Sequence, residues 1–387
     1  MRRESGLTFL EFFAGAGMAR IGLGPGWTCL FANDVDPLKA DIYAKAQGAG
    51  HLHLGDVGAL EGRMVPRGAL LAWASSPCQD VSLAGGREGL SGVRSGAFFG
   101  FWRQMEALGA DAPKLIVIEN VLGLATSHAG ADLGEIFRLL SEAGYWAGAL
   151  AIDAGWYLPQ SRPRLFVIAS RSPPPPALLA RAAPVSAADR AIGNAMAWAE
   201  AAAPDARRRL VRWRFERPVA PPPPLAEMIE PDSACDCWHS AAKTAKLLGL
   251  MNTAHRDMVA DASVAAKTDG RTRIGAVYRR VRLEVGGRVQ RAEVRFDGNV
   301  GCLRTAKGGS SRQFLVFCEA DGAIRSRALT PREGARLMGL ADDFPLPKSQ
   351  TAAFHVLGDG VAVPVVRALA AQILEPLADS ESAERAA

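Results

Sequence analysis

The sequence predicts an α/β protein whose core is a mostly parallel sheet, with a smaller domain inserted into it. Two observations support this prediction. From residue 7 to about residue 170, short apolar runs alternate with longer mixed segments, and beyond that point an arginine- and proline-rich region follows. Alternating strand-sized and helix-sized segments are typical of βαβ units, whose parallel strands are covered by helices on both faces. We therefore expect an α/β core domain.

The expected elements follow one another through this first part of the chain. Each candidate strand is a short apolar run, which is typical of a strand buried on both faces of a sheet. Helix-like segments lie between several of them, at residues 37–47 and 131–143. The expected strands are residues 8–13, 28–33, 70–75, 115–119, 147–152 and 165–169.

Proline runs mark the expected domain boundaries. Residues 173–176 and 221–224 are all proline, and such runs form stiff extended linkers. We expect the core domain to comprise residues 1–171 and 329–387, and the inserted domain to comprise residues 172–328.

The expected insert is basic and irregular. Its arginines gather at residues 207–217 and 271–295, and the second region has the alternating Val, Arg and Leu pattern of strands. An arginine-rich insert between two compact parts suggests a domain that reads a substrate. We expect its alanine-rich part, residues 177–203, to be a poorly ordered linker.

Bulk properties are compatible with a polyanionic partner. The chain has 387 residues, of which 49% are hydrophobic and 22% are charged, as in an ordinary globular protein. A formal charge of +5 and a pI of about 9.0 suit a polyanion without requiring one. No apolar run has the length of a membrane span, so we expect a cytoplasmic protein without a membrane partner, with its six cysteines reduced.

A glycine-containing turn follows the first expected strand. Gly15 and Gly17 lie where this strand would enter a helix, and glycine lets the backbone come close to a ligand. Asp34 directly follows the second expected strand and could accept hydrogen bonds from ribose hydroxyls, and Asp56 could accept from an adenine amino group. Arg20 stands where a dinucleotide fingerprint has glycine, which favours an adenosyl ligand over NAD. The alternative is a tight turn that binds no ligand.

The expected strand at residues 70–75 leads into Ser75-Ser76-Pro77-Cys78-Gln79. At this point the chain resembles the cytosine-5 DNA methyltransferase family, whose signature is a Pro-Cys-Gln triplet at the end of this strand. Further segments resemble motifs of that family and occur in its order. They are Ile118-Glu119-Asn120-Val121, Gln160-Ser161-Arg162-Pro163-Arg164, residues 329–339 and residues 358–364. The resemblance covers the chain except for the insert, and it implies a Rossmann-like fold that binds S-adenosylmethionine.

The resemblance implies transfer of a methyl group to carbon 5 of cytosine in a specific DNA sequence, and these residue types fit that chemistry. Cys78 would attack carbon 6 as a thiolate, which makes carbon 5 electron-rich. Glu119 would stabilise the ring at N3, and Arg162, together with Arg164, would hold the cytosine O2. Because carbon 5 is hidden in a stacked duplex, the base must be flipped out. The glycine-rich loop at residues 83–95 would close over the DNA.

The family's motifs also assign a cofactor site and DNA contacts to particular positions. The expected DNA contacts are Gln79, Ser82, Arg94 and Arg304. The expected cofactor-binding residues are Phe13, Gly15, Ala16, Gly17, Asp34, Val35, Asp56, Val57, Pro77, Ala97, Asp359 and Val361.

Asp359 departs from the family, which usually has Asn in this motif. A carboxylate at this position could pair with the ammonium or the sulfonium of S-adenosylmethionine, and it would repel the carboxylate of the same donor.

Two alternatives remain open at this stage. Cytosine methylation of RNA, or at the exocyclic N4, would use the same fold, although N4 enzymes normally carry a Ser/Asp/Asn-Pro-Pro-aromatic motif where this chain has Ser76-Pro77-Cys78-Gln79. A catalytically silent DNA-binding relative is the other, and the intact set of Cys78, Glu119 and Arg162 argues against it.

Double-stranded DNA is the expected partner, with a cognate restriction endonuclease as a companion enzyme and a monomeric state. No metal is expected. Cys235, Cys237 and His239 suggest a zinc site, with His255 nearby, but the usual second pair of ligands is missing from the spacing.

Overall fold

The computed structural model describes residues 6–77, 96–181, 186–232, 237–284, 286–305 and 312–386. The chain divides into two compact units. The first consists of Met1–Asp153, Pro163–Arg217 and Val361–Ala387, and the second consists of Ala154–Arg162 and Pro218–Gly360.

The first unit contains a seven-stranded sheet with the order β3-β2-β1-β4-β5-β7-β6. Its first five strands are parallel, and β7 runs antiparallel between β5 and β6. The predicted Rossmann-like, mostly parallel sheet is therefore confirmed. The strands are β1 (Thr8–Phe12), β2 (Thr28–Asp34), β3 (Leu52–Leu54), β4 (Leu71–Ser75), β5 (Leu115–Val121), β6 (Trp146–Asp153) and β7 (Pro163–Ser170).

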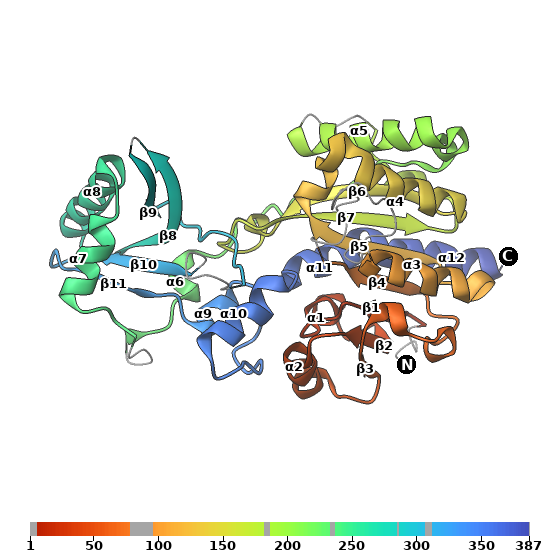
Figure 1. Ribbon diagram of the computed structural model, residues 1–387, viewed down its shortest axis with the longest axis horizontal. Helices are drawn as coiled ribbons and strands as arrows, with labels where there is room; N and C mark the ends of the chain where they lie inside the picture. The colour runs from red at the N-terminus through yellow and green to blue at the C-terminus, as the bar shows by residue number, and fades with distance from the viewer. Residues whose placement is uncertain are drawn as a thin grey trace. The chain divides into compact units, whose positions relative to one another are not determined.

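Helices cover both faces of this sheet (Figure 1). On one face, α3, α4 and α5 share a continuous apolar core with alternate residues of the strands, including Phe12, Ile116 and Ile118. Burial of both faces explains why the strands are nearly continuous apolar runs in the sequence. The helices of this unit are α1 (Met18–Leu23), α2 (Pro37–Gln47), α3 (Gly96–Leu108), α4 (Ala131–Glu142), α5 (Ala187–Ala202), α11 (Val363–Leu369) and α12 (Glu375–Ala386).

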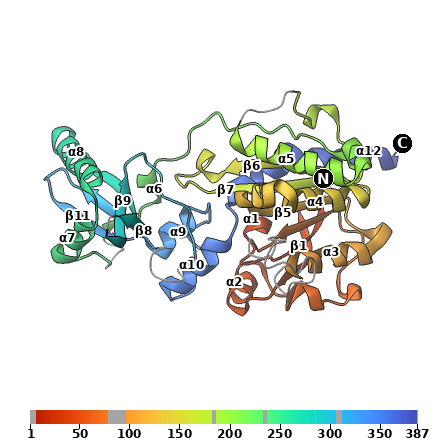
Figure 2. The same cartoon turned by 45° about the horizontal axis from the view of Figure 1, so that its top comes forward.

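The alanine-rich segment is a helix of the core, not the expected linker. A reciprocal capping box between Ser186 and Asp189 starts α5, which buries Ile192 and Ala195. Alanine is a strong helix former, and small residues let α5 approach α4 closely. A Cβ placed on Gly134 would lie 2.9 Å from the backbone oxygen of Ala195. The two helices lie side by side in both views (Figures 1 and 2).

The first basic cluster also belongs to the first unit, so the expected boundary at residue 172 is displaced. Val211 donates a backbone hydrogen bond to Ala147 of β6 (2.9 Å), and the indole of Trp213 donates to the Ile168 carbonyl of β7 (3.2 Å). These contacts cover the outer strand of the sheet. The proline run at residues 173–176 is thus a connection within one unit, because the chain beyond it returns to the same sheet.

The second unit is built on a four-stranded antiparallel sheet with the order β11-β10-β8-β9. The strand-like pattern of residues 271–295 is confirmed as a β8–β9 hairpin, and helices α7 and α8 cover its apolar face. The elements of this unit are α6 (Leu225–Met228), α7 (Ala241–Gly249), α8 (Thr253–Asp269), β8 (Arg273–Glu284), β9 (Gly287–Arg295), β10 (Gln313–Cys318), β11 (Ile324–Ala328), α9 (Pro331–Arg336) and α10 (Gln350–Asp359).

Helices α9 and α10 were expected in the core domain but belong to the second unit. A fully buried ion pair between Arg327 of β11 and Glu333 of α9 explains this placement, with N–O distances of 2.8 and 2.5 Å. Glu333 also accepts the backbone N–H of Glu230 at 3.0 Å. A buried ion pair with satisfied hydrogen bonds is strongly destabilising to break, so α9 stays with β11.

Two expectations drawn from bulk properties need revision or qualification. Cys237 is disulfide-bonded, so not every cysteine is a reduced thiol, whereas Cys29 and Cys318 are free thiols. Among the described residues, one helical run, Gln350–Glu381, is long and apolar enough to cross a membrane, but 56% of its most apolar window is buried inside the protein.

The docking of the basic cluster on β6 predicts the effect of a small substitution. A Cβ on Gly148 would lie 2.1 Å from the backbone oxygen of Val211, so Gly148→Ala should lower the free energy of unfolding by about 1–3 kcal/mol. Gly249→Ala is the control, because nothing lies within 4 Å of a Cβ at that position. Urea denaturation of both variants and of the wild-type protein measures the free energies of unfolding. Equal stabilities would contradict the assignment of this segment to the first unit.

Candidate functional site

The turn after β1 has an unusual backbone conformation. Phe13, Gly15 and Gly17 all have positive φ angles, of 55°, 56° and 78°. For a bulky residue such as Phe13 this conformation is uncommon and is found where the surroundings impose it. Gly17 closes the turn through a 2.9 Å hydrogen bond from its N–H to the Ala14 carbonyl. A Cβ on Gly15 would meet no atom within 4 Å, so space lies open above the loop.

The acid at the end of β2 holds this loop in place. One oxygen of the buried Asp34 carboxylate accepts the Gly15 N–H at 2.7 Å, and the other accepts the Asp36 N–H at 2.8 Å. Each carboxylate oxygen has a second lone pair, so Asp34 retains acceptor capacity for a ligand. The neighbouring Val35 side chain is 68% exposed, and Asp56, after β3, is exposed and accepts the Gly58 N–H at 2.7 Å. The predicted cofactor residues between Phe13 and Val57 therefore lie at the carboxyl ends of β1, β2 and β3.

Asn33 is a supporting residue that the sequence did not single out. Its amide donates to the carbonyls of His53 (3.1 Å) and Gly55 (2.9 Å), which fixes the end of β3 beside β2. Nothing in the local sequence distinguishes this asparagine from a turn residue.

The ends of β4 and β5 lie side by side, with Ser75 opposite Glu119 in the register. Asn120 donates to both the carbonyl and the hydroxyl of Ser76, each at 3.1 Å. These two hydrogen bonds fix the position of Ser76, the residue before the exposed Pro77. The sequence predicted the motif but gave Asn120 no role. Four predicted residues, Cys78, Gln79, Ser82 and Arg94, lie outside the described residues.

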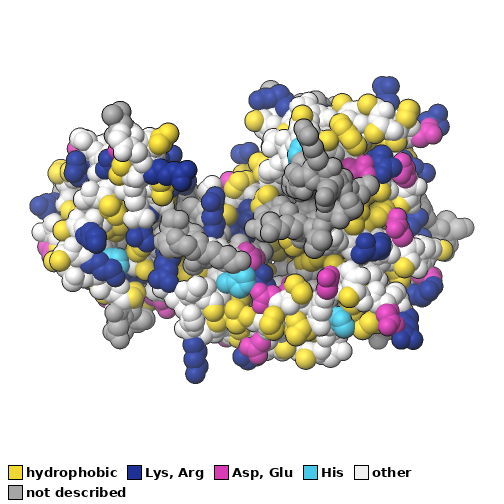
Figure 3. All heavy atoms as spheres, in the orientation of Figure 1, with side chains coloured by type: hydrophobic (Ala, Val, Ile, Leu, Met, Phe, Trp, Pro, Cys, Tyr) yellow, Lys and Arg dark blue, Asp and Glu magenta, His cyan; other side chains and the backbone are white. Residues whose placement is uncertain are grey.

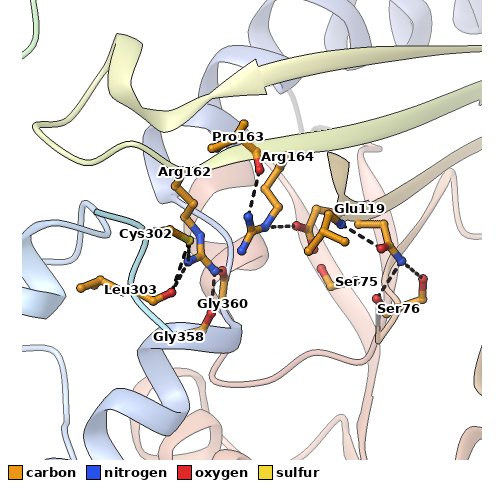
Figure 4. A network of polar contacts seen from close by, with 12 residues as sticks. Ser75, Ser76, Glu119, Arg162, Pro163, Arg164, Cys302, Leu303, Gly358 and Gly360 are labelled. Carbon is orange, nitrogen blue, oxygen red and sulfur yellow. Dashed lines mark hydrogen bonds and ion pairs between the residues drawn. The ribbon is translucent and has the colours of Figure 1, made fainter. Parts of the chain in front are cut away.

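Glu119 pairs with Arg164, as Figure 4 shows. Arg164 lies opposite Val121 in the antiparallel β5–β7 register, so it is a diagonal neighbour of Glu119 on the same face of the sheet. Their closest atoms, Arg164 Nε and Glu119 Oε1, are 3.2 Å apart. The Glu119 and Arg164 side chains are 7% and 15% exposed. This is a largely buried acid–guanidinium pair at the carboxyl end of β5.

Arg162 has a different environment from the one expected. It lies in the second unit, is 1% exposed, and donates to the carbonyls of Leu303 (2.9 Å), Gly358 (2.7 Å) and Gly360 (2.5 Å). Cys302 Sγ is a further acceptor at 3.3 Å (Figure 4). The guanidinium of Arg162 thus binds backbone carbonyls of its own unit, whereas Arg164 is the arginine that pairs with Glu119.

The remaining predicted residues divide between the units. Ala97 lies half-buried in α3, and Val361 is buried in the first unit. Asp359 and the exposed Arg304 belong to the second unit. The Thr305 hydroxyl donates to Asp359 at 2.8 Å, and His355 Nδ1 lies 3.6 Å from the same carboxylate. Asp359 thus has polar partners within its own unit.

The histidines of the suggested zinc site have other partners. His239 Nδ1 lies 3.0 Å from the Ser326 hydroxyl, and His255 Nδ1 lies 3.1 Å from the Val294 carbonyl. Cys237 is disulfide-bonded, and Cys235 lies outside the described residues. Within the described part of the chain, His, Cys, Asp and Glu side chains form no group of three or more that could hold a metal ion.

The chain matches a family described as "C-5 cytosine-specific DNA methylase" over residues 7–195 and 251–375. Among curated proteins, it is 24% identical over 378 residues to the type II methyltransferase M.HhaI of Haemophilus parahaemolyticus, covering 96% of this chain and 95% of that protein. It is 26% identical over 383 residues to M.HpaII of Haemophilus parainfluenzae, covering 96% and 90%.

Solved structures share the fold. The Dnmt2 methyltransferase of S. pombe superimposes with a TM-score of 0.58 and 17% identity, covering 96% of this chain and 99% of that chain. The Entamoeba histolytica methyltransferase EhMeth gives a TM-score of 0.60 at 15% identity, covering 97% and 98%.

The environment of Arg162 predicts a stability effect. Arg162→Lys should lower the free energy of unfolding by about 2–4 kcal/mol, because one ammonium cannot reach carbonyls on three sides and buried acceptors lose their donors. Arg332→Lys is a matched control, because Arg332 also donates to two carbonyls (3.2 and 3.0 Å) but is less buried; it should lose less than about 1 kcal/mol. Urea denaturation compares the two. A smaller loss for Arg162→Lys than for Arg332→Lys would contradict the structural role.

Proposed function

We propose a covalent route of catalysis for this chain, which belongs to the C-5 cytosine-specific DNA methylase family and is a DNA cytosine-5 methyltransferase. The observation that carries the proposal is the largely buried Glu119–Arg164 pair. It lies at the carboxyl end of β5, beside the end of β4, from which the chain runs on to Cys78. Ligands bind at the carboxyl ends of strands in open α/β sheets.

S-adenosylmethionine is the proposed cofactor, and when bound it supplies an electrophilic methyl group. The residues present fit an adenosyl ligand. The loop at residues 13–17 leaves space above Gly15, and the Asp34 carboxylate keeps acceptor capacity for ribose hydroxyls. The exposed Val35 offers an apolar contact to the adenine face, and Asp56 an acceptor for its amino group. Ala16, Gly17, Val57, Pro77, Ala97, Asp359 and Val361 complete the proposed set.

Cys78 is the proposed nucleophile. Its thiolate forms a bond to carbon 6 of the cytosine, and the electron pair of the C5–C6 double bond moves into the ring toward carbon 5 and N3. A proton on Glu119 meets N3, and the guanidinium of Arg164 donates to O2. After carbon 5 has gained the methyl group, a base removes its hydrogen as a proton. The returning electron pair restores the C5–C6 double bond and expels the Cys78 thiolate.

The DNA is held in part by the second unit in this proposal. The β8–β9 hairpin carries arginines whose carboxylate partners lie on the hairpin itself, including Arg282 with Glu293 and Arg291 with Glu284, each pair at 2.5 Å. Figure 3 shows Lys and Arg side chains distributed over this part of the surface. Arginines can contact phosphates and guanine edges, which suits recognition of a specific sequence.

The remaining DNA contacts and partners are proposals of the same kind. Gln79, Ser82, Arg94 and Arg304 would contact the duplex around a flipped cytosine. A cognate restriction endonuclease, a monomeric state and a cytoplasmic location complete this account. The family's description names carbon 5 of cytosine in DNA, which favours this account over methylation of RNA or N4 and over a catalytically silent relative.

Loss of the nucleophile tests the covalent route. With duplex DNA and labelled S-adenosylmethionine, the wild-type protein should produce 5-methylcytosine, and Cys78→Ser should produce none above background. Mass spectrometry of the digested nucleosides identifies the product. Cys318→Ala is the control, because that thiol is buried in the core of the second unit. Full activity of Cys78→Ser would contradict the mechanism, and N4-methylcytosine as the product would contradict the proposed reaction.

Glu119→Gln tests the acid. An amide keeps the shape of the side chain but cannot deliver a proton to N3, so the rate of methyl transfer should fall by about 10²–10⁴-fold. Single-turnover kinetics at saturating DNA measure the step itself. Glu135→Gln is the matched control, because Glu135 pairs with Arg138 on α4 and has no part in the proposed reaction. Equal rates for the two variants would refute the role of Glu119.

A further inference from the structure

Four polar side chains meet next to the loop at residues 13–17, and the buried Cys29 thiol of β2 lies 3.7 Å from one of them, the Tyr43 hydroxyl. Glu11 comes from β1, Arg20 from α1, Tyr43 from α2, and His51 from the segment before β3. The Tyr43 hydroxyl donates to Glu11 Oε2 at 3.3 Å, accepts from Arg20 Nη1 at 3.3 Å, and lies 3.0 Å from His51 Nε2. Arg20 Nη1 also contacts His51 Nε2. Glu11 and Tyr43 are 1% and 0% exposed, so this group, the Tyr43 cluster, is shielded from water at its centre.

The Tyr43 cluster contacts the last residue of the loop, Gly17. Gly17 is the N-cap residue of α1 and has no side chain to accept the amides of the first turn. The Tyr43 hydroxyl instead joins Glu11 of β1 to the side chain of Arg20 in that turn, at 3.3 Å from each. The ring of Tyr43 packs on Gly17, because a Cβ there would lie 3.0 Å from two of its carbons.

The start of the loop is connected to Glu11 by the backbone. Glu11 is followed after one residue by Phe13, whose φ of 55° begins the turn. The segment with positive φ angles therefore runs between Glu11 and the first turn of α1, and the Tyr43 hydroxyl joins Glu11 to Arg20 of that turn. Any shift of Tyr43 would change the support of both.

We propose that Tyr43 and Glu11 are positioning residues that hold the loop at residues 13–17 in its cofactor-binding conformation. This inference rests on the proposed binding of S-adenosylmethionine by that loop. In this proposal the Tyr43 cluster does not contact the cofactor. Substitutions of Tyr43 or Glu11 should therefore change the affinity for the cofactor and not the rate of the chemical step.

The proton on Glu11 is part of this arrangement. Burial raises the pKa of Glu11 to about 8, against the backbone N–H and the charge of Arg20 and the hydroxyl of Tyr43, while the nearby Asp34 raises it further. Burial and the charge of Arg20 lower the pKa of His51, so this ring is neutral at pH 7. Glu11 is consequently neutral at pH 7, and its ionisation above about pH 8 adds a buried negative charge near Asp34.

The pH dependence follows in sign. A carboxyl whose folded pKa lies above the unfolded value of 4.5 retains its proton in the folded protein, so its contribution to stability is lost as pH rises through about 8. We expect the affinity of the wild-type protein for S-adenosylmethionine to fall as the pH rises through about 8, where Glu11 ionises in the folded protein. Glu11→Gln mimics the protonated acid, so its affinity for S-adenosylmethionine should not change with pH in this range.

Calorimetric titration with S-adenosylmethionine tests the positioning role. Tyr43→Phe keeps the ring against Gly17 and removes only the hydroxyl, so the dissociation constant should rise about 3- to 10-fold. Methyl transfer at saturating cofactor should stay within about twofold of wild type. Tyr145→Phe is the matched control, because that buried hydroxyl donates to the Pro113 carbonyl at 2.7 Å in the same unit; its affinity should equal that of wild type.

The possible results test the proposed cofactor and the positioning role of Tyr43 and Glu11 separately. Wild-type protein that fails to bind S-adenosylmethionine would overturn the proposed cofactor, and this inference with it. Wild-type binding with equal affinity for Tyr43→Phe, or an unchanged pH dependence in Glu11→Gln, would overturn the inference alone. Weaker binding by Tyr43→Phe but not by Tyr145→Phe, at equal unfolding midpoints in urea, would support it.

Discussion

The buried guanidinium of Arg162 decides where the chain passes from one unit to the other. Its hydrogen bonds to Leu303, Gly358 and Gly360 hold residues 154–162 within the second unit, and β7 of the first unit begins at the next residue, Pro163. A planar guanidinium has its donors in fixed directions, so few other side chains could satisfy these carbonyls together. Because β7 starts there, Arg164 is its second residue, and its register opposite Val121 brings Glu119 within 3.2 Å.

Local patterns in the sequence predicted the parts of the fold that depend on burial. The strands of the first unit are apolar runs because helices cover both faces of the sheet, and all six predicted strands are present. The domain boundaries could not be predicted in the same way, because composition does not reveal where a segment docks. The proline run at residues 173–176 suggested a boundary, yet α5 beyond it buries Ile192 and Ala195 in the first core.

In the candidate site, too, local sequence patterns predicted some residues, whereas the roles of others depend on contacts that are distant in the sequence. Gly15, Asp34 and Glu119 were predicted, because strand ends and glycine turns have recognisable positions in the chain. The roles of Asn120 and Tyr43 were not, since they depend on contacts with residues 44 and 32 positions away. For Arg162 and Arg164 the motif alone could not separate an arginine that binds backbone carbonyls from one that pairs with Glu119. Two residues of the same type, two positions apart, differ here in the unit to which they belong.

The central claim is that Cys78 bonds covalently to the cytosine whose ring is held by Glu119 and Arg164. A duplex carrying 5-fluorocytosine at the target tests it directly, because fluorine at carbon 5 cannot leave as the proton does, and the adduct persists. With S-adenosylmethionine present, mass spectrometry of the digested protein should find the methylated nucleotide attached to the peptide that contains Cys78. An adduct on another residue, or no adduct from an enzyme that still methylates ordinary DNA, would contradict the account.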